Sequence, residues 1–174
     1  MDTIIKFWFP NSNFQKFWFD KSKDEYITEN YKSILLEELN KEIKLEDFKI
    51  LDFLKYIILY DQLSRNIFRE NKENVYFKEC NNRALKISKY FIMHHFKYNM
   101  NFNYISFILL PLRHSKKQEN YNLIFEILNN IKNNDIIYRN IVTNKTIFNK
   151  FCKATFRDVE LYKLSKSSFM EQEI

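Results

Sequence analysis

The chain has 174 residues, and its composition of 45% hydrophobic and 18% aromatic residues excludes an intrinsically disordered protein. It contains no glycine and only two prolines, which excludes glycine-rich phosphate loops and dinucleotide-binding turns. Tight β-hairpin turns also depend on glycine, whereas helix ends can use the abundant asparagine instead. The composition therefore predicts an all-α protein, and the length predicts one domain over residues 1–174.

The net charge of +6 would suit nucleic acid, but the abundance of Lys, Asn and Ile is typical of an AT-rich coding sequence. Such a sequence acquires a basic surface without any ligand, so nucleic acid is kept only as a less favoured partner. Cys80 and Cys152 lie far apart and show no metal-binding spacing, so we predict neither a metal nor a cofactor. The chain shows no signal region and no apolar run of about 18 residues, which predicts a cytoplasmic protein with no membrane association.

Two aromatic clusters, Phe7–Phe9 and Phe17–Phe19, open the chain on either side of a proline. The first cluster reads as a short helix that ends at this proline, because proline cannot continue a helix. Ser22 and Glu25 then match a capping box, which predicts a helix running to about Lys41.

Helical patterns continue along the rest of the chain. Further helices are predicted over about 46–69, 74–97 and 136–151, and the capping-box match Ser115–Gln118 predicts another before the last of these. Short polar breaks between helices favour antiparallel neighbours. The fold class predicted is therefore all-α, built from stacked antiparallel helical hairpins.

The densest polar feature lies at the end of the helix predicted over 46–69. Upstream residues of this helix are apolar on almost every side, as in a buried helix. At 100° per residue, five polar residues fall within one arc of about 140°. They are Asp61, Gln62, Arg65, Asn66 and Arg69. Buried charge is costly unless it is paired or used, so this polar stripe marks either a structural network or a binding site.

The polar stripe holds more cations than anions. Asp61 and Arg65 form an acid-then-base pair at positions i and i+4, but one carboxylate cannot also neutralise Arg69. Either a carboxylate elsewhere in the chain or a bound anion completes the pairing, since guanidinium groups suit carboxylate and phosphate. From these residues alone, the favoured interpretation is a buried network that fixes helix packing.

Three segments resemble motifs of the DUF924 family of uncharacterised proteins. ILYDQLSRNIFR (58–69) resembles that family's LLDQFPRNIFR, and FILLPLRHS (107–115) is similar to its FLYLPFxHSE. FCKATFRDVELYK (151–163) resembles its FGRFPHRNxxLGR, with Phe156 in place of the histidine and Asp158 in place of the asparagine. The resemblance implies an all-helical, tetratricopeptide-like fold, and it suggests that the three segments converge on one cavity.

The resemblance adds His114, Ser115 and Arg157 to the candidate site. Imidazole is the usual general acid or base near neutral pH, so His114 is the candidate catalytic residue. Ser115 is also explained as the cap of the next helix. With Phe156 in place of the family's second histidine, one further candidate base or ligand is lost.

We therefore expect a cavity, lined by the stripe and these three residues, that binds a small anionic ligand or a carboxylate-bearing peptide. Two alternatives stay open. One is an enzyme acting on a phosphorylated or carboxylated metabolite, with His114 as acid/base. The other is a helical scaffold for proteins or RNA, in which the polar stripe is purely structural.

Overall fold

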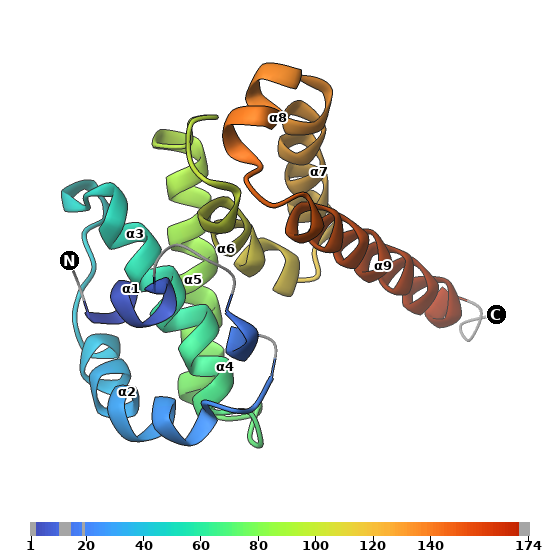
Figure 1. Ribbon diagram of the computed structural model, residues 1–174. Coiled ribbons are helices and arrows are strands. Elements are labelled where there is room, and N and C mark those ends of the chain that lie inside the picture. The colour runs from blue at the N-terminus through green and yellow to red at the C-terminus, as the bar shows by residue number, and fades with distance from the viewer. Residues whose placement is uncertain (1–2, 11–14, 19, 171–174) are drawn as a thin grey trace. The chain divides into compact units, whose positions relative to one another are not determined.

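The computed structural model describes residues 3–10, 15–18 and 20–170, with side chains as far as residue 163 (Figure 1). Every regular element in this part of the chain is helical, so the all-α fold predicted from the missing glycine is confirmed. The α-helices are α1 (Thr3–Trp8), α2 (Asp24–Leu39), α3 (Ile50–Ile57), α4 (Ser64–Ile67), α5 (Val75–His94), α6 (Phe102–His114), α7 (Gln118–Asn133), α8 (Asp135–Ile141) and α9 (Lys145–Met170). Tetratricopeptide-like stacking is compatible with this order and stays a prediction.

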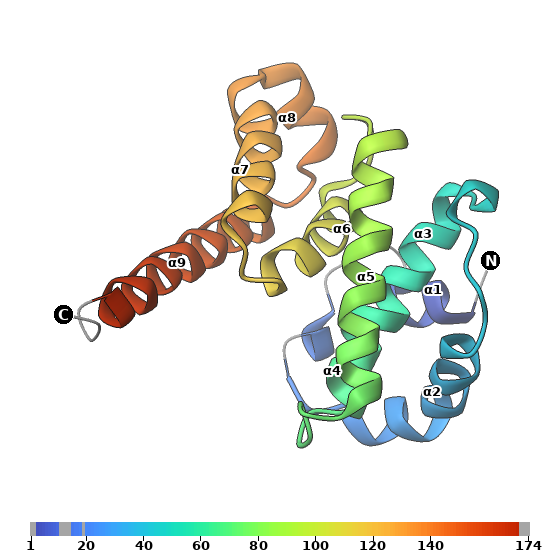
Figure 2. The same ribbon diagram turned by 180° about the vertical axis from the view of Figure 1, so that it is seen from behind.

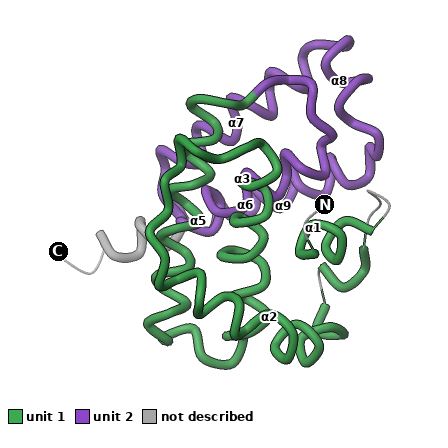
Figure 3. The backbone as a smooth tube through the Cα atoms, turned by 90° about the vertical axis from the view of Figure 1, so that its left-hand side faces the viewer, with its two compact units in different colours: residues 1–96 green, residues 97–174 purple. Residues whose placement is uncertain are grey.

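The chain divides into two compact units, residues 1–96 and 97–174 (Figure 3). The first unit contains α1 to α5 and the second contains α6 to α9. The proposal that residues 1–174 fold as a single domain stays a prediction. No helix in the described ranges combines the length and the apolar character needed to cross a membrane.

The helix predicted over 46–69 is present from Ile50, but it is not uniform. Between α3 and α4 the chain forms a π-helical turn, η4 (Ile58–Leu63), in which hydrogen bonds reach back five residues instead of four. The N–H of Ser64 accordingly donates to the carbonyl of Leu59. All six residues of η4 are buried, including the polar pair Asp61 and Gln62.

The first unit is built around α5, which lies alongside α3 and α4 (Figures 1 and 2). The contact between α3 and α5 is aromatic. The ring of the fully buried Phe53 lies 5.3 Å from that of Phe91 and 4.9 Å from that of His95, and Phe48 covers its other side at 5.1 Å. This aromatic contact fixes the position of the helix that carries the polar stripe.

In the second unit, α6 packs against α7 and α9, and α7 packs against α8. Phe102 of α6 contacts the rings of Phe148 and Phe151 of α9 at 4.8 and 5.8 Å. The largely apolar residues 104–110 belong to α6, which continues through Pro111.

Asparagine side chains cap the starts of four helices. Asn74, Asn101, Asn134 and Asn144 each accept a hydrogen bond from the backbone N–H two residues later, at the start of α5, α6, α8 and α9. The cap at Asn144 follows a break after α8, so the single helix predicted over 136–151 is wrong.

Both predicted serine capping boxes are wrong. Asp20 accepts hydrogen bonds from both the backbone N–H and the hydroxyl of Ser22, so the N–H that a capping box directs to Glu25 is already paired. Helix α2 begins two residues later with no side-chain cap. Ser115 belongs to the C-terminal end of α6, and α7 begins after Lys117, also with no side-chain cap. A local pattern did not distinguish a helix start from the turn before it.

Replacing Phe53 by alanine is expected to lower the free energy of unfolding by about 3–5 kcal/mol, because the cavity would open between α3 and α5. Leu51→Ala, at a half-exposed position of the same helix, is the matched control and should cost less than about 1 kcal/mol. Urea denaturation followed by circular dichroism measures both. Equal losses would contradict the assignment of Phe53 to the core.

Candidate functional site

Asp61 is 1% exposed in the π-helical turn, and its carboxylate is fully engaged. Nε and Nη2 of Arg65 both donate to its Oδ1 at 3.2 Å, and the amide of Gln62 donates to its Oδ2. Nη2 of Arg65 also donates to Oδ1 of Asn81 on α5 at 2.7 Å, and the guanidinium lies 5.5 Å from the centre of the Phe77 ring. The buried charge is therefore paired, as its burial requires.

Asp24, the first residue of α2, pairs with the second arginine of the stripe. Nε and Nη2 of Arg69 donate to its two carboxylate oxygens, the latter bond at 3.0 Å, and Nδ2 of Asn66 donates to Oδ1 at 2.7 Å. The hydrogen bonds that Arg69 donates to Asp24 raise the pKa of Arg69. A carboxylate elsewhere in the chain thus completes the stripe, which is the first of the two alternatives left open by the sequence.

Each arginine of the stripe is held along one edge only. Asp24 and Asp61 balance the charges of Arg65 and Arg69, so these four groups carry no net charge. Nη1 of each arginine makes no hydrogen bond with any residue that the structure describes, and the two side chains are 30% and 33% exposed. The stripe therefore presents oriented N–H donors to solvent without an excess of positive charge.

The π-helical turn brings the carboxylate and the amide of the stripe inward together. Its wide turn leaves carbonyl groups that need donors, and the Ser64 hydroxyl donates to the carbonyl of Tyr60 at 2.5 Å and that of Asp61 at 3.3 Å. Single π-helical turns inside α-helices occur frequently at functional sites.

Three of the predicted site residues, His114, Ser115 and Arg157, lie in the second unit. The hydroxyl of Ser115 donates to the carbonyl of Leu112 at 2.5 Å and accepts a hydrogen bond from Asn120 at 2.6 Å. Its proton is committed to the end of α6. His114 is half-buried at the last position of α6, and the side chain of Arg157 is 72% exposed.

The sequence analysis missed an ion pair between Arg113 and Asp158, which adjoin His114 and Arg157 in the sequence. Nε of Arg113 lies 3.0 Å from the carboxylate of Asp158, and its guanidinium lies over the ring of Phe151. Burial and then the charge of Asp158 raise the pKa of Tyr121. This pair links α6 to α9, and the only sequence signal for it was the acidic residue that replaces the family's asparagine.

The polar stripe belongs to the first unit, whereas His114, Ser115 and Arg157 belong to the second. The expectation that both sets of residues line one cavity stays a prediction.

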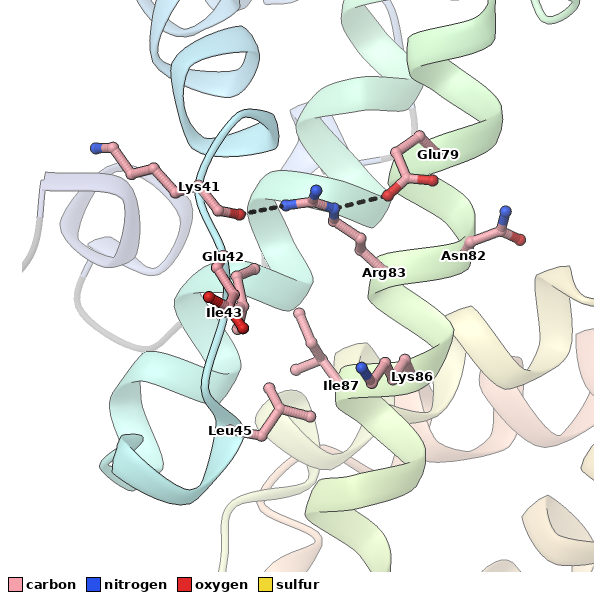
Figure 4. Close-up of a pocket in the computed structure, with 9 residues that line it drawn as sticks. All are labelled: Lys41, Glu42, Ile43, Leu45, Glu79, Asn82, Arg83, Lys86 and Ile87. Atoms are coloured by element: carbon pink, nitrogen blue, oxygen red, sulfur yellow. Dashed lines mark hydrogen bonds and ion pairs between the residues drawn. The ribbon is translucent and has the colours of Figure 1, made fainter.

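A hollow of 360 Å³ lies in the first unit between residues 41–45 and α5 (Figure 4). None of the residues that line it was predicted as a site residue. Arg83 is its central cation, and Figure 4 shows its guanidinium directed at the carboxylate of Glu79 and a backbone carbonyl.

Arg83 closes the C-terminal end of α2. Its two terminal nitrogens donate to three backbone carbonyl groups at distances between 2.7 and 3.2 Å, those of Glu38, Leu39 and Lys41. A cation that binds the last carbonyls also complements the negative end of the helix dipole. Because Nε is paired with Glu79 at 2.8 Å, Arg83 has no open edge comparable to that of Arg65.

The residues that sequence reasoning missed are the partners of the stripe, Asp24 and Asn81. Asp24 was treated only as an inner position of the capping box at Ser22. The excess of arginine over carboxylate in the stripe did signal that a partner was needed. No local spacing identified which carboxylate would supply it.

A sequence model of a family described as a bacterial protein of unknown function (DUF924) matches residues 4–162. Searches of curated proteins and of solved structures found no match.

Low pH should lower the free energy of unfolding through Glu38, near the C-terminal end of α2. Burial alone would raise the pKa of Glu38, but hydrogen bonds from Lys41 and Tyr56 outweigh burial and lower it. A carboxylate with a lowered pKa in the folded state stabilises the protein above its unfolded pKa of about 4.3, and this contribution is lost as the pH falls through the folded pKa.

The free energy of unfolding of Glu38→Gln should therefore fall less than that of the unmutated protein between about pH 5 and pH 3. Urea denaturation at a series of pH values gives this difference. Glu29→Gln, at an exposed position of α2, is the matched control for removal of a carboxylate. Identical pH dependence of the two variants would show that the contacts of Glu38 contribute nothing.

Proposed function

This chain belongs to the DUF924 family, and we propose that it is a binding protein whose small ligand carries a carboxylate or phosphate group held at the polar stripe. One observation carries the proposal: Arg65 is fixed along one edge by Asp61 and Asn81, and its Nη1 edge is open to solvent. Arg69, in the turn that follows α4, has a second open edge.

Fixed guanidinium groups favour binding because less side-chain entropy is lost when the ligand arrives. The charges of the stripe are already balanced, so a ligand gains little from net positive charge. It gains instead from oriented N–H donors, which suit the two oxygens of a carboxylate or two oxygens of a phosphate group. The same chemistry applies to a metabolite and to a carboxylate on a peptide.

Binding is proposed in preference to catalysis because the observation that carries the proposal is a set of fixed N–H donors on Arg65 and Arg69, which suit an anion and perform no reaction themselves. A role for His114 as acid/base stays a prediction, as does a contribution of Arg157 to the ligand site.

The proposal is tested by thermal shift with inorganic phosphate, adenosine monophosphate, succinate, citrate and a short peptide with a free carboxylate terminus. At a ligand concentration of about 100 times Kd, binding should stabilise the protein by about 2.7 kcal/mol. Arg65→Lys keeps the charge beside Asp61 but loses the planar fork, so it should remove the shift while preserving the fold.

Arg139→Lys, at an exposed position of α8, is the matched control and should keep the full shift. Circular dichroism of each variant without ligand confirms that it is folded. The proposal fails if no compound of the panel stabilises the protein, or if Arg65→Lys responds as Arg139→Lys does.

A further inference from the structure

The net positive charge of the chain is concentrated in its second unit, because that unit has fewer acidic residues. Residues 97–174 contain twelve Lys and Arg against seven Asp and Glu, whereas residues 1–96 contain sixteen against fifteen. Drift toward Lys codons acts on the whole chain, so it does not account for an excess confined to one unit. The excess therefore requires a local explanation.

One face of α9 carries much of this charge. The helix buries Phe148, Phe151, Thr155 and Val159 on its inner side, which packs against α6 and α7. As far as residue 163, its exposed charged side chains are five basic and one acidic. They are Lys145, Lys150, Lys153, Arg157, Lys163 and Glu160.

Most of these cations have no carboxylate of their own. Lys145, Lys150 and Lys153 make no ion pair with any residue in the described part of the chain. Arg157 lies 4.0 Å from Asp158, whose carboxylate is the closer partner of Arg113 at 3.0 Å. The positive charge of this face is therefore available to a partner.

An aromatic ring lies among these cations. Phe156 is 60% exposed, one position before Arg157 and three after Lys153, so all three side chains share the outward face of α9. A ring that contributes little to the core, placed between cations, has the two elements by which proteins bind single-stranded nucleic acid: a stacking surface for a base and cations for the phosphates.

We infer that the outward face of α9 binds single-stranded nucleic acid, with Lys150, Lys153 and Arg157 contacting phosphates and Phe156 stacking on one base. A duplex offers its phosphates but no unstacked base for Phe156, so it is the poorer partner. An anionic membrane surface would gain from the cations, but Phe156 and Leu161 alone give little apolar area for insertion.

The test is fluorescence anisotropy of a labelled 20-nucleotide oligouridylate with the full chain at increasing potassium chloride. Three phosphate contacts predict that the logarithm of the association constant falls with the logarithm of salt concentration with a slope of about −2. Phe156→Ala should weaken binding about tenfold, the effect of losing one stacked base, and should leave the slope unchanged. Lys153→Gln should make the slope shallower by about 0.7.

Matched controls come from the first unit, where Tyr76→Ala removes an exposed ring and Lys86→Gln removes an exposed cation. Both should bind as the unmutated chain does. The inference is overturned if the oligouridylate does not bind, or if Phe156→Ala leaves its affinity unchanged. Tighter binding of a 20-base-pair RNA duplex, or of phosphatidylserine vesicles, would overturn it equally.

Discussion

The carboxylate of Asp24 is the group on which the arrangement of the polar stripe depends. It accepts hydrogen bonds from Asn66 and Arg69, residues 42 and 45 positions later in the chain. Without it, Arg69 would face the cost of a partly buried cation that has no counter-ion. Its position at the first residue of α2 is also favourable, since the positive end of the helix dipole lies there.

Together with Asp24, the stripe joins four elements of the first unit. Asp61 and Arg65 lie on the π-helical turn and α4, Asp24 lies on α2, and Asn81 lies on α5. Each bond satisfies a polar group that would otherwise be buried alone. The same bonds use only one edge of each guanidinium, so the network that fixes these helices also holds two sets of donors in place at its surface.

The sequence predicted the helical class because the reasons for it are local. A chain without glycine cannot form primed hairpin turns, and its many asparagines supply the caps seen at Asn74, Asn101, Asn134 and Asn144. The periodicity of the stripe was also local, and so was its excess of arginine.

Other features depend on competing hydrogen bonds or on packing between residues that are far apart in the sequence. Ser22 fits a capping box, but Asp20 already accepts the backbone N–H that Glu25 would accept. The π-helical turn changes the register of the helix after Ile57, which a constant 100° per residue does not capture. The choice of Asp24 among the many carboxylates of the chain depends on how α2 packs against α4, and no pattern within either helix encodes that choice.

A double-mutant cycle between Asp24 and Arg69 tests the central claim most directly. The free energies of unfolding of Asp24→Asn, Arg69→Gln and the double variant are measured by urea denaturation and compared with that of the unmutated chain. Because both side chains are partly exposed, a coupling energy of about 1 kcal/mol is predicted. Strict additivity of the two substitutions would contradict the claim that Asp24 ties α2 to the polar stripe.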